Sequence, residues 1–380
     1  MKKIIAILLF ILFAQNLPAE DLKNILQGLG QNVAKAYVSP LTNSFGSNIT
    51  SGWVHRAAPN KFLGIDIELN VIMMATPFND DNKKFNVGGN FNYVFTASDA
   101  TTIANQFDYS SIKAPGDPAG TSPETTTLRN QVKNELITQL QGNSLTYLIE
   151  ISGPTVVGKK DEYLNVKFLP QDLILNVAGQ NYTVKVNNPI DQQITSIYGF
   201  LDGLPMLPFG VPQLTLGTVY GTQVTFRGLP SVKINDDLGD FSYFGFGLNH
   251  NIDQWIPAPI PLNISAGFFI QNMKVGDIFK SKATTFGIFA SKTFGFAFLS
   301  VTPYGNLTFE NSTTTVSYNL QVLNPVTNNP ESIPLSFDLS GDNKTKLALG
   351  AAFKLGLINL NFEYGIAKYN TLSAGVGFIF

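Results

Sequence analysis

The most informative stretch of the sequence is its last, TLSAGVGFIF, at residues 371–380. Apolar side chains occupy every second position of this stretch, and small residues fill most of the positions between them. The apolar set is Leu372, Ala374, Val376, Phe378 and Phe380, and the intervening set is Ser373, Gly375, Gly377 and Ile379. Because successive side chains of a β-strand point to opposite faces, this alternation predicts a strand with one apolar face.

The same alternation recurs at residues 63–71, 262–270, 347–355 and 359–366. Each segment has about ten residues, the length of a tilted strand that crosses a bilayer. The opposite faces carry mainly Gly, Ser and Asn, with Phe269 as an exception. A β-sandwich also alternates, but short turns and aromatic residues near strand ends favour a membrane barrel. Those aromatic residues are Trp255, Tyr304, Tyr318 and Tyr369.

The composition supports a membrane protein. The chain has 380 residues, of which 14% are charged and 44% hydrophobic, with a net charge of −2 and no cysteine. Charged residues make up about 25% of an ordinary soluble domain, so this chain has too few for a fully solvated surface. The slight negative charge argues against a nucleic-acid partner. The lack of cysteine excludes disulfides, thiolate metal sites and a cysteine nucleophile.

Residues 1–19 show the three parts of an export signal. Lysines follow Met1, an apolar run extends from Ile4 to Ala14, and Ala19 supplies a small residue for cleavage. The alternative is a membrane anchor, but a spanning helix needs about 20 apolar residues and this run is shorter. We therefore expect residues 1–19 to be a cleaved signal peptide.

Residues 20–60 are expected to form a hatch, or plug, ahead of the first barrel strand. Over 21–37, apolar residues recur at the spacing of one helical face, and residues 37–60 have too little periodicity for a membrane strand. The apolar stripe comprises Leu22, Ile25, Leu26, Leu29 and Val33. This short helix either plugs the lumen or covers the periplasmic mouth, and a helix packed at the rim is an equal alternative.

The barrel itself is expected over residues 61–380. Strands are predicted at 62–76 and 85–96, followed by a long insertion at 99–143 that contains a helix from Thr127 to Gln141. At roughly 20 residues per strand and connection, the remaining length gives about 14 strands, and roughly 12 to 16 would fit. The predicted fold is all-β: an antiparallel transmembrane β-barrel with a short helical N-terminal hatch.

The end of the chain is similar to the C-terminal signal of bacterial outer-membrane barrels. This resemblance implies that Phe378 and Phe380 are read by the barrel assembly machinery. From this resemblance and the export signal, we expect the chain to lie in the outer membrane, with lipid as a partner.

Over nearly all of the mature chain, the sequence resembles a family of bacterial outer-membrane proteins with no assigned activity. The motifs that carry this resemblance are YVSPL at 37–41, FG at 45–46, SGW at 51–53, KFLGID at 61–66, LPSVK at 229–233 and QWIP at 254–257. More weakly, the layout is similar to that of the long-chain fatty-acid transporters of the outer membrane (FadL-type). That likeness implies a hatch, a 14-stranded barrel and hydrophobic substrates. The hatch of those transporters carries Asn-Pro-Ala, where this chain has Ser39-Pro40-Leu41.

Charged residues opposite the apolar positions face the lumen if the apolar positions face lipid. The candidates are Asp66, Glu68, Lys354 and Glu363. They either tune ion selectivity or pair across strands and hold the barrel wall, and the second reading carries more weight.

We expect no enzymatic activity, no cofactor and no metal site. The histidines are His55 and His250, and no serine has a spacing that marks it as the partner of His250 in a catalytic triad. Two histidines without cysteine also argue against a transition-metal site.

The sequence thus favours passive transport of small hydrophobic molecules across the outer membrane. The alternative is a structural or binding barrel with a filled lumen and no transport. Gly, Ser and Asn on the inner faces favour open space, whereas Phe269 and Phe289 would favour filling if they pointed inward.

We predict that the protein is heat-modifiable. A closed barrel pairs its backbone N–H and C=O groups within the sheet, so it resists SDS until it is boiled. Boiled and unboiled samples should therefore migrate differently on a gel. Identical migration, together with extraction by carbonate, would contradict the barrel fold.

Overall fold

The computed structural model describes residues 30–59, 65–91, 95–142, 147–186, 189–218, 220–235, 239–257, 260–296, 298–323 and 330–380. The expected signal peptide at 1–19 lies outside these residues, as do four members of the expected apolar stripe, Leu22, Ile25, Leu26 and Leu29. None of the described helices is both long and apolar enough to cross a membrane.

Ten strands of a 12-stranded antiparallel sheet form a closed ring. β1 (Ile65–Pro77) pairs with β8 (Met206–Thr218) on one side and with β18 (Thr371–Ile379) on the other. β12 (Phe279–Ser291) pairs with β14 (Leu299–Leu323) and completes the ring. The other ring strands are β9 (Thr222–Asn235), β10 (Gly239–Asn251), β11 (Asn263–Val275), β16 (Thr345–Leu355) and β17 (Ile358–Ile366). The ring therefore has no free strand edge.

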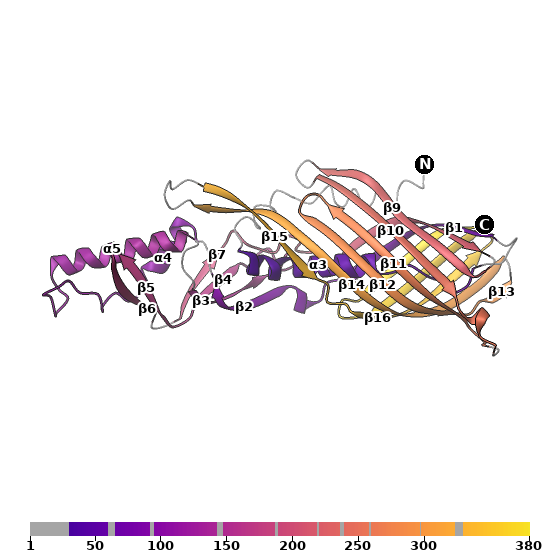
Figure 1. Ribbon diagram of the computed structural model, residues 1–380, viewed down its shortest axis with the longest axis horizontal. Helices are drawn as coiled ribbons and strands as arrows, with labels where there is room; N and C mark the ends of the chain where they lie inside the picture. The colour runs from indigo at the N-terminus through magenta and orange to yellow at the C-terminus, as the bar shows by residue number, and fades with distance from the viewer. Residues whose placement is uncertain are drawn as a thin grey trace.

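Residues 78–205, between β1 and β8, form an elongated extension from one end of the ring (Figure 1). The extension contains a four-stranded sheet in the order β2-β3-β4-β7 and a separate hairpin, β5–β6. Its strands are β2 (Lys84–Phe91), β3 (Tyr147–Pro154), β4 (Leu164–Phe168), β5 (Gln171–Val177), β6 (Gln180–Val186) and β7 (Ile190–Ile194). Its helices are η2 (Asp80–Asn82), α4 (Ala97–Ala104) and α5 (Pro123–Gln141).

Two strands of the larger sheet lie outside the ring, and both pair with β14. β13 (Phe294–Phe296) pairs with the start of β14, and β15 (Pro330–Ser340) pairs with its last part, from Thr313 to Leu323. Figure 1 shows β15 leaving the ring on the side of the extension.

The ring has fewer strands than the 14 or so that the sequence predicted. The strand expected at residues 85–96 corresponds to β2, which pairs with β3 of the extension. The insertion expected at 99–143 lies within the longer extension, and the helix expected from Thr127 is the larger part of α5. Alternation predicts a half-buried strand in a soluble sheet as well as in a barrel, so it could not assign these segments.

The extension packs around buried apolar residues. Val132, Leu136 and Leu140 recur every four residues along α5 and are fully buried, which places them on one helical face. α5 begins at Pro123, and the hydroxyl of Ser122 accepts a hydrogen bond from the Thr125 N–H at 3.1 Å, as an N-cap residue does. This buried face of α5 belongs to a continuous apolar core that reaches, through α3, to buried residues of the ring.

The outer face of the ring is apolar. Leu372, Val376 and Phe380 are 43%, 51% and 56% exposed, while Ser373, between them, is 6% exposed. Alternate positions of the other ring strands show the same division. The predicted alternation is thus confirmed in three dimensions, and it forms the apolar band that a transmembrane barrel presents to lipid.

The expectation that aromatic side chains at strand ends face a membrane interface is only partly correct. Trp255, in η3 (Asp253–Trp255), is 70% exposed, but Tyr304, Tyr318 and Tyr369 are each less than a tenth exposed. Tyr304 occupies an inward position of β14, and its hydroxyl donates to the Phe362 carbonyl at 3.3 Å. Three of these four aromatic side chains therefore do not face a membrane interface.

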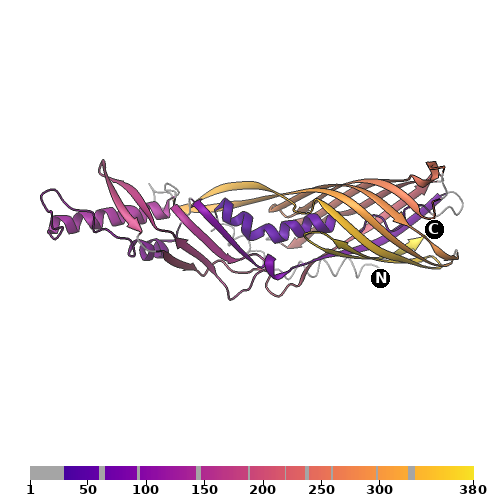
Figure 2. The ribbon, with the colours of Figure 1, turned by 90° about the horizontal axis from the view of Figure 1, so that it is seen from below.

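A helix, α3 (Gln31–Ile49), runs from the extension into the ring (Figure 2). It continues well past residue 37, where the sequence predicted irregular structure. Polar side chains satisfy its own carbonyls, as when the Ser44 hydroxyl donates to the Pro40 carbonyl at 2.8 Å. Val33, the described member of the expected stripe, is buried. The low periodicity of this helix reflects burial on several sides rather than a lack of regular structure.

Replacing Phe380 by alanine should reduce assembly in cells more than it reduces stability. Phe380 connects the end of the chain to the first strand of the barrel, because its N–H donates to the Ile67 carbonyl of β1 at 2.8 Å. The aromatic side chain of Phe380 lies on the outer face of the barrel. Its loss there lowers the free energy of unfolding by less than the ~3 kcal/mol expected for a fully buried Phe. Phe362→Ala is the matched control, because the Phe362 side chain, on β17, is likewise exposed on the outer face, at 55%. Equal amounts of heat-modifiable barrel in Phe380→Ala and wild-type membranes would contradict the role of Phe380 in assembly.

Candidate functional site

The candidate site is the interior of the ring, which is occupied by α3 and by residues 50–59 that follow it. We call residues 31–59 the plug. At its start, the Tyr37 carbonyl accepts from the Val156 N–H at 2.9 Å, which ties the plug to the extension. Further along, the Ser47 hydroxyl donates to the Tyr369 carbonyl of the ring at 3.0 Å. Near its end, the Ala57 N–H donates to the Ser291 hydroxyl at 2.9 Å. The plug therefore contacts the ring from one end to the other.

The turn after α3 is held by a buried ion pair of the barrel wall. Lys346 of β16 and Glu310 of β14 lie 2.6 Å apart, and each side chain is 2% exposed. Lys346 also donates to the hydroxyls of Thr50 and Ser51, at 3.1 and 2.7 Å. The Thr50 hydroxyl donates to Glu310 at 3.0 Å. Both charges are thus shared between the wall and the plug.

Arg227 of β9 holds the next residues of the plug. Its Nη1 donates to the Ser51 carbonyl at 2.8 Å, and its Nη2 donates to the Gly52 carbonyl. Its guanidinium lies 4.0 Å from the centre of the Trp53 ring, a cation–π contact that gains strength away from water. On the wall, its Nε donates to Gln213 at 2.7 Å. A fully buried arginine therefore fixes both backbone and side chain of the plug.

Glu363 of β17 binds the same turn from another strand. It accepts from the Gly52 N–H at 3.2 Å and from the Asn306 side chain at 3.1 Å. Glu363 is 6% exposed. Since Arg227 binds the Gly52 carbonyl and Glu363 its N–H, this glycine is held through both its polar backbone groups.

The end of the plug pairs with the acidic residues of β1. His55 Nε2 lies 2.6 Å from Glu68 Oε1. Arg56 Nη2 lies 2.6 Å from Asp66 Oδ2 and 3.2 Å from Glu68 Oε2. Asn359 of β17 also donates to Glu68, at 3.1 Å. These carboxylates are nearly inaccessible, so their charges are compensated by the plug rather than by water.

Aromatic packing fills the space beside these ion pairs. The Trp53 and Phe269 ring centres are 4.9 Å apart, and Phe289 packs on Phe269. A Cβ on Gly247 would lie only 2.2 Å from the Phe269 ring, and one on Gly245 would lie 2.7 Å from Trp53. Small residues on the inner faces therefore make room for these rings. The remaining gap beside Trp53 is about 10 Å³, close to the space of a single water.

The structure places Asp66, Glu68 and Glu363 on the inner face, in contact with the plug, and Lys354 on the wall of a cavity at the end of the ring. Sequence reasoning missed Arg227, Glu310 and Lys346. A signal was present, since each stands at an inward position next to an outward apolar residue, as Lys346 does beside Leu347. His250 lies at the ring end and accepts from Trp255 Nε1 at 2.8 Å, away from the plug contacts.

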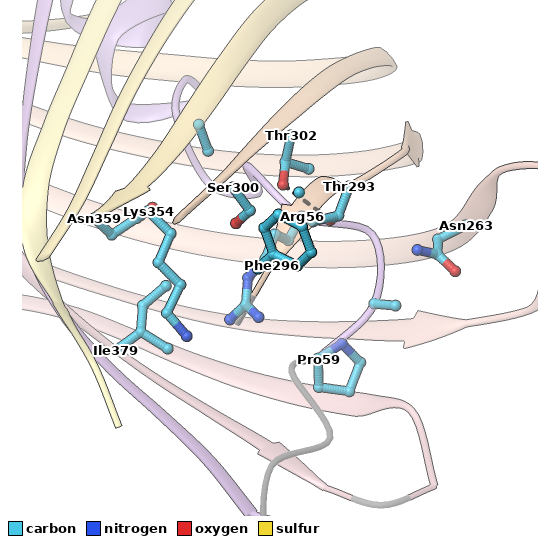
Figure 3. A pocket seen from close by; sticks show the side chains of 13 residues that line it. Arg56, Pro59, Asn263, Thr293, Phe296, Ser300, Thr302, Lys354, Asn359 and Ile379 are labelled. Atoms are coloured by element: carbon cyan, nitrogen blue, oxygen red, sulfur yellow. Dashed lines mark hydrogen bonds between the residues drawn. The ribbon is translucent and has the colours of Figure 1, made fainter. Parts of the chain in front are cut away.

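A cavity of about 290 Å³ opens where the plug ends (Figure 3). It lies at the ring end opposite the extension, beside the start of β14 and the end of β16. Arg56 and Pro59 of the plug line one side, and Lys354, Ser300 and Thr302 line the wall. We call it the mouth cavity. Within the described part of the chain, no three His, Asp or Glu side chains come close enough together to hold a metal ion.

A family profile described as "Family of unknown function (DUF6588)" matches residues 1–380. No curated protein matches the chain. Among solved structures, a loop-deletion mutant of OmpT, an outer membrane protein of Vibrio cholerae, is 9% identical, with a TM-score of 0.23 and coverage of 83% of this chain and 99% of that one. OpdQ of Pseudomonas aeruginosa is 7% identical, with a TM-score of 0.17 and coverage of 83% and 97%. TM-scores this low do not establish a shared topology.

Breaking the buried Lys346–Glu310 pair from one side should loosen the plug. Lys346→Met leaves Glu310 buried without its cation, which typically costs about 3–5 kcal/mol, whereas removing both charges costs much less. We expect Lys346→Met to expose Trp53, and Lys346→Met/Glu310→Gln to restore most of its protection. The measurement is acrylamide quenching of Trp53 fluorescence in a Trp255→Phe background, because these are the two tryptophans of the chain.

Lys280→Gln is the matched control for this experiment, since Lys280 lies on the outside of β12. Quenching equal to that of the Trp255→Phe parent in all variants would show that the ion pair does not hold the plug.

Proposed function

The chain belongs to this family of unknown function, and we propose that it is an outer-membrane barrel that is closed by its own plug and anchors the extension outside the membrane. One observation carries this proposal: the charged groups on the inner wall bind the plug. Arg227, Glu363 and the Lys346–Glu310 pair all contact residues 50–52. A wall that served a permeating solute would keep such groups available to it.

The apolar outer face supports the membrane location. The exposed Leu, Ile and Phe side chains form a band around a ring without free edges, and a closed ring is the form in which strands cross hydrocarbon. Barrels of this type have short periplasmic turns and longer loops outside. On that basis the end that carries the extension, by far the longest connection of the ring, faces outward, and the opposite end, with the C-terminus, faces the periplasm.

Passive transport is the second candidate, and the mouth cavity favours it. The cavity ends at Arg56 and Pro59 of the plug, so displacement of the plug would join it to the lumen. In this reading the plug is a gate. The buried charges along the lumen favour polar solutes over the hydrophobic ones that the sequence suggested.

Conductance across a planar bilayer separates the two functions. We predict that the wild-type protein shows no sustained conductance, because the plug fills the ring. A variant lacking residues 31–59 should conduct, since its inner wall would be hydrated. Deletion of the β5–β6 hairpin, residues 171–186 in the extension, is the control and should stay closed. Each variant must first show heat-modifiable migration. Sustained wild-type conductance would favour passive transport instead.

A further inference from the structure

The mouth cavity has a cationic and hydroxylated wall. Among its lining residues are the cations Arg56 and Lys354, and none is an acid. Ser300, Thr302 and Asn359 add neutral polar groups. Figure 3 shows the side chains of Arg56 and Lys354 reaching toward the same space. An arrangement of cations and hydroxyl donors suits an anion.

Lys354 is the cation that lacks a counter-charge. Its neighbours across the sheet are Ser300 of β14 and Asn359 of β17, both neutral. In the described part of the chain it forms no ion pair, although it is only partly exposed. In a recess of this kind, a bound anion would stabilise the lysine charge as a neighbouring carboxylate stabilises the charge of other lysines.

Arg56 adds a second donor. Its Nη2 is engaged by Asp66 and Glu68, but its Nε is buried and has no acceptor among the described residues. A buried donor without an acceptor is costly. An acceptor in the cavity could relieve that cost.

Part of the remaining wall is apolar. Phe296 of β13 is 83% exposed and lines the cavity together with Pro59 and Ile379. Such a surface disfavours a bare, fully hydrated ion and favours a molecule with an apolar part beside its charge. The volume of about 290 Å³ is at the lower end of sites for small organic ligands.

We propose that the mouth cavity binds a small organic anion, with its carboxylate or phosphate at Lys354 and its apolar part against Phe296. The hydroxyls of Ser300 and Thr302 donate to the anion. This site goes beyond the proposed anchoring function, because it lies at the ring end and needs no open lumen.

Titration calorimetry on the full chain in detergent tests the site, with benzoate as the probe and benzamide as its neutral counterpart. We expect benzoate to bind at least tenfold more tightly than benzamide. Lys354→Gln should weaken benzoate at least tenfold, which corresponds to about 1.4 kcal/mol. Lys280→Gln, which removes a lysine from the outside of β12, should leave the affinity unchanged.

Heat-modifiable migration of Lys354→Gln shows that the barrel has formed, and Ser300→Ala provides a milder variant, with an expected loss of about threefold. Benzoate binding that is equal in wild type and Lys354→Gln would overturn the proposal. So would equal binding of benzoate and benzamide, or no benzoate binding at millimolar concentration.

Discussion

Backbone hydrogen bonding in hydrocarbon is the constraint on which the rest of this structure depends. Away from water, each strand of the sheet needs a partner on both sides, and the pairings of β1 with β18 and of β12 with β14 supply the last of them. Once the ring is closed, its two faces meet different surroundings. Across the band that meets hydrocarbon, the outer face must be apolar, and the polar side chains of this band are left to the inside.

The polar inside creates a second requirement, because buried charges need partners. Asp66, Glu68 and Arg227 face a narrow lumen in which water could solvate them only if the space stayed open. The plug satisfies these groups instead, with its backbone carbonyls, His55 and Arg56. The same contacts that make the wall stable therefore also close it, so that stability and permeability oppose each other in this barrel.

The sequence predicted the strands better than it predicted their contacts. Alternation follows from local geometry, so the outward positions from Leu372 to Phe380 could be read directly. The strand number was too high because it was derived from chain length: only residues 99–143 were set aside, whereas the extension takes up residues 78–205, including β2. The plug contacts join residues far apart in the chain, such as Ser51 and Arg227, and no local pattern encodes such a pairing. Phe269 was the visible clue, an apolar ring at an inward position that needed Trp53 to pack against.

The direction of the plug has a consequence for how the molecule is made. Tyr37 is bound at the extension, and Ala57 is bound at the opposite end of the ring, from which β1 sets out. The plug thus runs lengthwise through the ring whose strands follow it in the same chain. If the ring closed first, the plug would have to enter it from one end. Closure of the β1–β18 pairing around a plug already in place avoids that step, so the topology favours this order of events during assembly.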